Sequence, residues 1–127
     1  MPLSIWNELM EAEIRFVQGK RYRTRIAEAG QDNAEILIMT HGGGGPLETF
    51  ARNVVPLSKH VHAIAIEILW HGLSDAPEVS NNPAEQVADQ ILDVMDALGI
   101  EKAWVHGEAY SASAVSWLAR NHAGRLK

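Results

Sequence analysis

The stretch from Trp104 to Ala114, which reads WVHGEAYSASA, has the pattern of a reactive turn between a strand and a helix. An apolar segment leads into Gly107, and small residues that can begin a helix follow it. Turns of this kind, called nucleophile elbows, hold one strained residue at the apex, with its side chain exposed for attack. The apex residue here is Ala109, which has no nucleophilic atom. The pattern therefore predicts the backbone of a reactive site without its reactive oxygen.

Ser111 is the other residue of this turn that could supply a nucleophile. If Ser111 were the apex, Ala109 and Ser113 would be the small flanking residues. That register would place the apex inside the helix, two residues further from the strand than the usual register allows. We therefore expect Ser111 to be a small packing residue.

A second loop with chemical potential consists of His41 and the four glycines at 42–45. Glycine lets backbone N–H groups approach a ligand closely, and such groups can stabilise the negative oxygen that develops on a carbonyl substrate. A dinucleotide-binding loop is the alternative, with Glu67 about 20 residues later as the ribose-binding acid. However, Leu47 stands where the third glycine of G-x-G-x-x-G would fall, and no P-loop lysine follows. We expect an oxyanion loop.

The elements that must position these loops follow from hydrophobic periodicity. Short segments rich in Ile and Val are typical of parallel strands covered on both faces. Asn82 as a cap, Pro83 at the first position and Gly99 as a stop predict a long helix between two such strands. Alternating segments around Gly19 predict an antiparallel hairpin at a sheet edge. We expect strands at about 14–18, 21–28, 34–40, 61–69 and 102–107, and helices at about 47–54 (ended by Pro56), 83–98 and 110–121.

This alternation predicts an α/β fold, with a mostly parallel sheet, an N-terminal antiparallel hairpin and flanking helices. The 127 residues fit a single domain. With 46% hydrophobic and 21% charged residues, the composition is that of a globular domain.

Composition and charge exclude several functional classes. The net charge is −5 and no block of Lys and Arg is present, so we expect no nucleic-acid partner. No apolar run approaches membrane-spanning length, and the acidic N-terminus is unlike a signal peptide. The lack of cysteine excludes disulfides and thiolate metal sites and is compatible with the cytoplasmic location that we expect.

We expect the remaining polar and aromatic residues to have structural roles. His60 and His62 form an H-x-H pair with His71 downstream, but no carboxylate completes a metal site, so we expect a solvated strand end, no metal and no cofactor. We expect His106 to be buried by its strand and Asp75 to brace a turn. Trp70 and Trp117 are expected in the core or in a pocket lining.

Three stretches, taken together, resemble the N-terminal half of α/β-hydrolase-fold enzymes. They are THGGGGPLETFARNVVPL (40–57), AIEILWHGLSDAPE (65–78) and VHGEAYSASAVSWLARNHAGRLK (105–127). The chain is most similar to the type that cleaves carbon–carbon bonds in ring-fission products, and to related esterases, in which HGxGG, GHGxSD and GESxGG motifs occur in this order. The resemblance covers nearly the whole chain after Gly19 and implies a small carbonyl substrate.

The resemblance also assigns roles to residues of the two loops. The N–H groups of Gly43 and Tyr110 would form the oxyanion hole, and Ala109 would occupy the position of the nucleophilic serine. The other residues that would surround the substrate are His41, Gly42, Gly44 and Glu108, the last as a charged pocket wall or as a hydrogen-bond partner of the glycine loop.

This sequence departs from the family pattern at several positions. Ala109 replaces Ser, Ser111 replaces a Gly, Trp70 replaces the first Gly of GHG, and Glu67 stands where Asp is common. The asparagine that ring-fission hydrolases often carry after the glycine loop has Thr49 and Asn53 as its nearest candidates.

In the family order, the acid and the histidine of the catalytic triad follow the elbow, which here lies close to Lys127. We therefore expect a second chain, or the remainder of the polypeptide, to supply them and to complete the sheet beside the elbow strand. Three hypotheses remain: a hydrolase whose serine is replaced by Ala109, a non-catalytic relative that binds a small ligand or a partner, and a nucleotide-binding domain.

Overall fold

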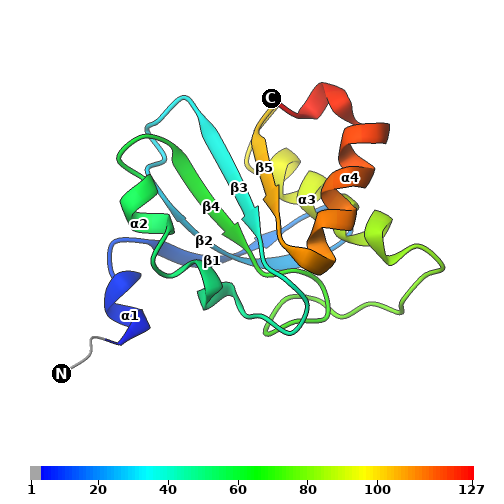
Figure 1. Ribbon diagram of the computed structural model, residues 1–127, viewed down its shortest axis with the longest axis horizontal. Helices are drawn as coiled ribbons and strands as arrows, with labels where there is room; N and C mark the ends of the chain where they lie inside the picture. Colours follow the sequence, from blue (N-terminus) through cyan, green and yellow to red (C-terminus); the bar gives the residue numbers. More distant parts are fainter. Residues whose placement is uncertain (1–3) are drawn as a thin grey trace.

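The computed structural model describes residues 4–127, and its centre is a five-stranded mixed sheet (Figure 1). The strands are β1 (Glu13–Gln18), β2 (Arg23–Ala29), β3 (Ile36–Thr40), β4 (His62–Ile66) and β5 (Trp104–Gly107). Their order in the sheet is β1-β2-β4-β3-β5. β1 and β2 form an antiparallel hairpin that joins β4 in antiparallel register, whereas β4, β3 and β5 run parallel. The predicted α/β class with an N-terminal antiparallel hairpin is confirmed.

Helices cover both faces of this sheet. They are α1 (Ile5–Glu8), η1 (Leu47–Phe50), α2 (Val54–Leu57), α3 (Pro83–Ala97), η2 (Ala109–Ser111), α4 (Ala112–Asn121) and η3 (Ala123–Arg125), where η marks a 3₁₀ helix. The two long helices, α3 and α4, pack on one face, and the short helices η1 and α2 pack on the other (Figure 1). Within residues 4–127, no helix has the length and apolar character needed to cross a membrane.

The alternation of residue sizes along β4 explains the two faces. Ile64 and Ile66 point toward α3 and α4 and form the larger core with residues such as Ile91. Ala63 and Ala65 point toward α2, and their small side chains let that short helix approach the sheet. All five side chains are completely buried. The central strands are therefore apolar on both faces, as the sequence predicted.

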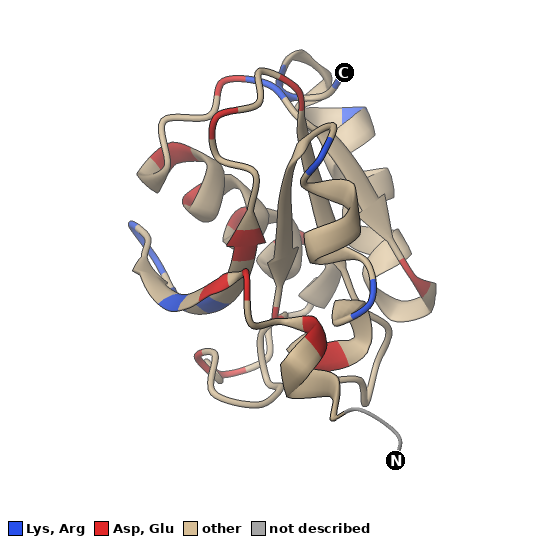
Figure 2. Ribbon diagram, turned by 90° about the vertical axis from the view of Figure 1, so that its left-hand side faces the viewer, with Lys and Arg blue, Asp and Glu red and all other residues tan. Residues whose placement is uncertain are grey.

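Charged residues fix the hairpin to the helical layer. Figure 2 shows Lys and Arg segments separated from one another and interspersed with Asp and Glu segments. Asp93 of α3 accepts hydrogen bonds from the backbone N–H groups of Arg21 and Tyr22, and its other oxygen pairs with the Arg21 guanidinium at 2.6 Å. A Cβ on Gly19 would stand only 2.5 Å from the Asp93 Cβ, which explains why this turn contains glycine.

Two of the differences from the expected elements have clear local causes. The strand expected at 61–69 ends at Ile66, because the next residue, Glu67, anchors a network of turns described below. The helix expected at 47–54 is instead the pair η1 and α2, and Pro56 lies inside α2 rather than after it. Pro56 is the third residue of α2, where a backbone N–H has no partner within the helix, so proline is tolerated there.

The edge position of β5 exposes one side of the elbow strand. His106 is therefore half exposed, with 49% of its side chain accessible, and the prediction that its strand buries it is wrong. Trp104 is exposed on the same strand. At the start of β5, Ala103 pairs in parallel with Leu126, through hydrogen bonds that join the backbone of Ala103 to Arg125 and Lys127.

Candidate active site

The turn after β5 holds Ala109 in a left-handed backbone conformation, with φ at +45°. An L-residue other than glycine adopts this region rarely and at a cost of about 1–2 kcal/mol. Gly107, at the end of β5, is required because a Cβ there would meet the Val115 side chain at 2.7 Å and the Ser111 carbonyl at 2.9 Å. The chain thus turns sharply from strand to helix, with Ala109 at the apex.

Ser111 ties this turn to the end of β3. Its hydroxyl oxygen lies 2.9 Å from the Thr40 hydroxyl and 3.0 Å from the Thr40 carbonyl. The same oxygen accepts the backbone N–H of Glu108 at 3.0 Å. Ser111 is completely buried, so no substrate can reach this hydroxyl without unfolding the turn. The geometry gives Ser111 a structural role at the base of the turn and leaves Ala109 at its exposed side.

The glycine loop packs directly against this turn. A Cβ added to Gly42 would lie 3.5 Å from the Cβ of Ala109, and one added to Gly43 would lie 3.4 Å from that of Tyr110. Among the residues that the structure describes, the backbone N–H groups of Gly43 and Tyr110 donate to no protein acceptor. Two free donors therefore stand on adjacent loops at the carboxyl ends of β3 and β5.

The other amides of the glycine loop are engaged. The N–H of Gly44 donates to Nε2 of His71 at 2.9 Å, and the N–H of Gly45 donates to the carbonyl of Gly42 at 3.1 Å. A pyrophosphate site would need several of these groups free and convergent. The arrangement therefore argues against the nucleotide-binding interpretation of this loop.

His41 supports the loop from below. Its side chain is completely buried, with Nε2 accepting the N–H of Ile68 at 3.2 Å and Nδ1 lying 2.8 Å from the carbonyl of Gly42. Because a carbonyl can only accept, Nδ1 carries the proton and the ring is neutral. Burial lowers the pKa of His41 below its ordinary value of 6.5, although the hydrogen bond to Gly42 opposes this shift. His41 was expected beside the substrate, but it shapes the loop and has no exposed surface.

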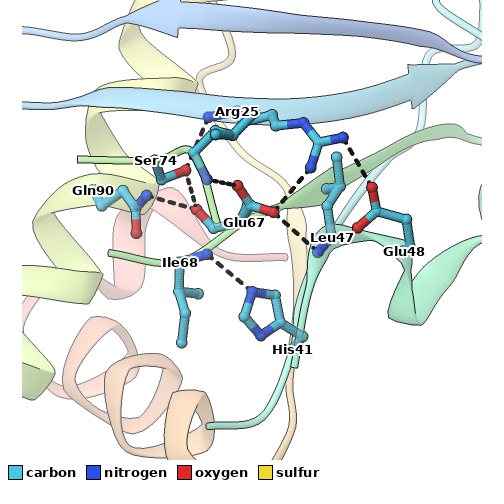
Figure 3. A network of polar contacts seen from close by, with 9 residues as sticks. Arg25, His41, Leu47, Glu48, Glu67, Ile68, Ser74 and Gln90 are labelled. Atoms are coloured by element: carbon cyan, nitrogen blue, oxygen red, sulfur yellow. Dashed lines mark hydrogen bonds and ion pairs between the residues drawn. The ribbon is translucent and has the colours of Figure 1, made fainter. Parts of the chain in front are cut away.

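Glu67 is the centre of a buried network that joins β2 to two loops (Figure 3). Its Oε2 accepts the Leu47 N–H at 3.2 Å and the Arg25 guanidinium at 3.1 Å, and its Oε1 accepts the Leu73 N–H at 2.7 Å. Arg25 also donates to Glu48 of η1 at 2.9 Å. The network fixes the end of the glycine loop to β2 and to the turn after β4. The only sequence signal for this network was the presence of one acidic residue, Glu67, in the apolar segment expected as a strand at 61–69.

The turn after β4 contains two positive φ angles that explain its sequence. A Cβ on Gly72 (φ +50°) would collide with the carboxylate of Glu67. Trp70 stands where the family pattern has the first glycine of GHG. Its φ of +67° shows that the backbone there keeps a conformation that favours glycine. The Trp70 indole N–H compensates by donating to the Pro77 carbonyl at 2.7 Å. Asp75 braces this turn, as expected, by accepting the N–H of Arg23 at 2.8 Å.

His62 differs from its predicted role as a solvated strand-end residue. Its Nε2 lies 2.7 Å from the carboxylate of Glu28, and only 12% of its side chain is exposed. Arg15 pairs with the same carboxylate at 2.8 Å. Burial alone would raise the pKa of Glu28, but the bonds from His62 and Arg15 outweigh it and hold that pKa below its ordinary value of 4.5. Within residues 4–127, no group of three or more His, Asp or Glu side chains is arranged to hold a metal ion.

A pocket of about 390 Å³ opens beside the elbow strand, on the sheet face that carries η1 and α2. Its floor is apolar, and its polar lining includes both candidate residues of the segment after the glycine loop, together with Glu108. The lining residues are Leu37, Met39, Thr49, Phe50, Asn53, Leu57, His106 and Glu108. Glu108 is therefore a pocket wall rather than a partner of the glycine loop.

Comparisons with known proteins agree with this architecture. No protein-family model matches the chain. It is 31% identical over 108 residues to a 2-hydroxymuconate semialdehyde hydrolase from Pseudomonas sp., covering 83% of this chain and 38% of that protein. It is 31% identical over 108 residues to the dihydrolipoyllysine-residue acetyltransferase component of an acetoin cleaving system from Cupriavidus necator, covering 85% of this chain and 28% of that protein.

A solved structure gives the same result in three dimensions. The enol-lactonase from Burkholderia xenovorans superimposes with a TM-score of 0.81 at 26% identity, over 89% of this chain and 44% of that one. The chain thus spans less than half the length of the relatives it matches. Sequence and structure together show that the chain resembles α/β-hydrolases and has the N-terminal part of the α/β-hydrolase fold.

Proposed function

We propose that residues 105–111 are a nucleophile elbow whose serine is replaced by Ala109, in a hydrolase that acts on a small carbonyl substrate. The substrate would be an ester or a dienoate-type compound cleaved at a carbon–carbon bond. Similarity to a 2-hydroxymuconate semialdehyde hydrolase and to an enol-lactonase supports this class of substrate. With alanine at the apex, the chain is expected to bind such a substrate without cleaving it.

The observation that carries this proposal is the left-handed conformation of Ala109 next to two free amides. Alanine gains nothing from a φ of +45°, whereas a nucleophile at that position would project toward a carbonyl carbon. The free N–H groups of Gly43 and Tyr110 are suited to hold the oxygen of that carbonyl as it becomes negative. The backbone of the site is thus retained although its nucleophile is absent.

The catalytic acid and base must come from other residues. Both histidines beside the glycine loop, His41 and His71, are bonded to backbone groups through both ring nitrogens, so neither is available as a base. We propose that the remainder of the polypeptide or a second chain provides the acid and the histidine and adds a strand beside β5. The edge position of β5 and the partial coverage of the relatives support this.

The test is the substitution A109S in the full-length protein, assayed with p-nitrophenyl esters and with a ring-fission dienoate. Hydrolysis that is absent in the parent, and is abolished by a serine-directed phosphonate, supports the proposal. The matched control is A112S, which adds the same hydroxyl three positions later in α4. Equal activity in A109S and A112S would contradict the proposal, because the position of the hydroxyl would then be irrelevant.

A non-catalytic relative that binds a ligand is the second candidate. The pocket beside β5, with its apolar floor and the polar Glu108 at its wall, favours this function because it is present without a nucleophile. In this case A109S would remain inactive while the parent and A109S bind the dienoate with equal affinity by calorimetry. Activity of A109S would exclude this candidate.

A further inference from the structure

His71 makes two hydrogen bonds that together fix its protonation state. Its Nδ1 lies 2.8 Å from the carbonyl of Leu69, which can only accept, so Nδ1 carries a proton. Its Nε2 accepts the backbone N–H of Gly44 at 2.9 Å and must therefore carry a lone pair. Only the neutral ring with its proton on Nδ1 satisfies both bonds. A doubly protonated ring would present an N–H to the N–H of Gly44.

Gly44 is the part of the glycine loop that depends most on this bond. It has a φ of +78°, and a Cβ built on it would have no atom within 4 Å, so it faces open space. Its neighbours are held from within the loop or against the elbow: Gly45 bonds to Gly42, and Gly43 lies against Tyr110. The hydrogen bond to His71 is thus the tie between the loop apex and the turn that follows β4.

We propose that His71 is a positioning residue that holds the glycine loop in its donor conformation, and that it does so only while its imidazole is neutral. This proposal rests on the proposed function, because the loop that His71 fixes carries the Gly43 amide. Protonation of His71 breaks the bond to Gly44 and releases the loop. The neutral ring therefore preorganises the site and the protonated ring loosens it, without any change at the elbow itself.

The groups around the two rings are consistent with such a device. The His41 ring packs edge-on against His71, with centroids 5.1 Å apart, so a charge on one ring disfavours a charge on the other. The acidic groups that act on His41 are Glu67 from the base of the turn and Glu108 from the elbow. Glu67 already accepts hydrogen bonds from Arg25, Leu47 and Leu73, so its carboxylate is directed at these donors and not at His71.

The test is solvent exchange of the Gly44 amide, measured by NMR against pH in the full-length parent protein, H71Q and H71F. In the parent, protonation of His71 should accelerate exchange of the Gly44 amide about fivefold beyond the intrinsic effect of pH on exchange. A factor of about five corresponds to the loss of one net hydrogen bond. H71Q keeps a carbonyl acceptor that does not titrate, so its Gly44 amide stays protected across the same range. H71F lacks an acceptor and loses protection at every pH. H60Q, at an exposed histidine, serves as the control and behaves as the parent does.

Protection of Gly44 that is unchanged in H71F, or unaffected by protonation of His71 in the parent, overturns the proposal. If H71F does not fold, the comparison of the parent with H71Q decides the question alone. A second arm of the test uses the A109S background. In that background, H71F should lower kcat with little change in KM. H71Q should have a higher kcat than H71F and should flatten the acid limb of the pH profile. An inactive A109S would count against the proposed function only, since exchange at Gly44 reports on His71 without catalysis.

Discussion

Ala109 faces Gly42 across the two loops of the site, and a Cβ on Gly42 would stand 3.5 Å from the Cβ of Ala109. The apex of the elbow is thus covered on one side by a backbone without side chains. Next to this contact lie the free N–H groups of Gly43 and Tyr110. A reactive atom at position 109 would therefore have donors beside it for a carbonyl oxygen.

The strained conformation of Ala109 predicts an unusual response to glycine. A109G should leave the free energy of unfolding unchanged or raise it by about 1 kcal/mol, because glycine adopts positive φ without steric cost. The same substitution at Ala112, which is helical with φ at −59°, should lower stability by about 1 kcal/mol. Urea unfolding of both variants measures the contrast. Equal destabilisation by A109G and A112G would contradict a left-handed Ala109.

Removing the hydroxyl of Ser111 should loosen the base of the elbow. S111A removes the hydroxyl that both the Glu108 N–H and the Thr40 hydroxyl contact, and leaves each with one acceptor, the Thr40 carbonyl at 3.2 Å and the His106 carbonyl at 3.0 Å. The lost hydrogen bonds should cost about 1–2 kcal/mol of unfolding free energy. S113A removes an exposed hydroxyl that bonds the Tyr110 carbonyl and should change stability by less than about 0.5 kcal/mol. An S111A protein as stable as S113A would show that Ser111 does not support the turn.

The Glu67 network predicts a large cost for a nearly isosteric change. In E67Q the amide group would direct an N–H at the donor groups of Leu47 or Leu73, and Arg25 would lose one of its two acid partners. We expect E67Q to lower the free energy of unfolding by about 3 kcal/mol. This is the lower end of the cost of breaking a buried ion pair, because Glu48 still pairs with Arg25. Calorimetric or urea unfolding provides the measurement. E48Q is the matched control, and a loss in E48Q as large as that in E67Q would argue against Glu67 as the centre.

The lowered pKa of Glu28 predicts an acid limb in stability. Its carboxylate is stabilised in the fold by His62 and Arg15, so its contribution is complete above the ordinary value of 4.5 and is lost as the pH falls through the folded value. Unfolding free energy measured from neutral to acidic pH should therefore decrease below about pH 4.5, and E28Q should flatten this decrease. E13Q, at an exposed glutamate, should leave it unchanged. If the unfolding free energies of the parent and E28Q had parallel pH dependences, the pairing of Glu28 with His62 and Arg15 would be contradicted.

The fold was predictable because its signals are local and repeated. The Ile-Ala alternation of β4, the Asn82 and Pro83 start of α3, and the glycines of both loops each specify an element without reference to distant residues. The ordered motifs likewise predict Ala109 at the apex of the turn. Such patterns reflect what the backbone requires at each position, such as a tight turn or a helix start, and proteins of this fold share these requirements.

The supporting contacts could not be predicted in the same way. The pairing of Glu67 with Arg25, and of His62 with Glu28, joins residues 42 and 34 positions apart, so sequence spacing contains no record of either. The exposure of His106 depends on β5 being an edge strand, which is a property of the whole sheet. The role of His71 depends on two backbone partners, and side-chain type alone does not reveal them.

The most direct measurement of the central claim is covalent labelling of A109S by a fluorophosphonate in the full-length protein, read by intact mass and peptide mapping. If position 109 is the apex of a nucleophile elbow, A109S gains one phosphonyl group mapped to that position. The parent and A112S gain none under the same conditions. A folded A109S that stays unlabelled, or a parent labelled at Ser111, would contradict the assignment of Ala109 as the nucleophile position.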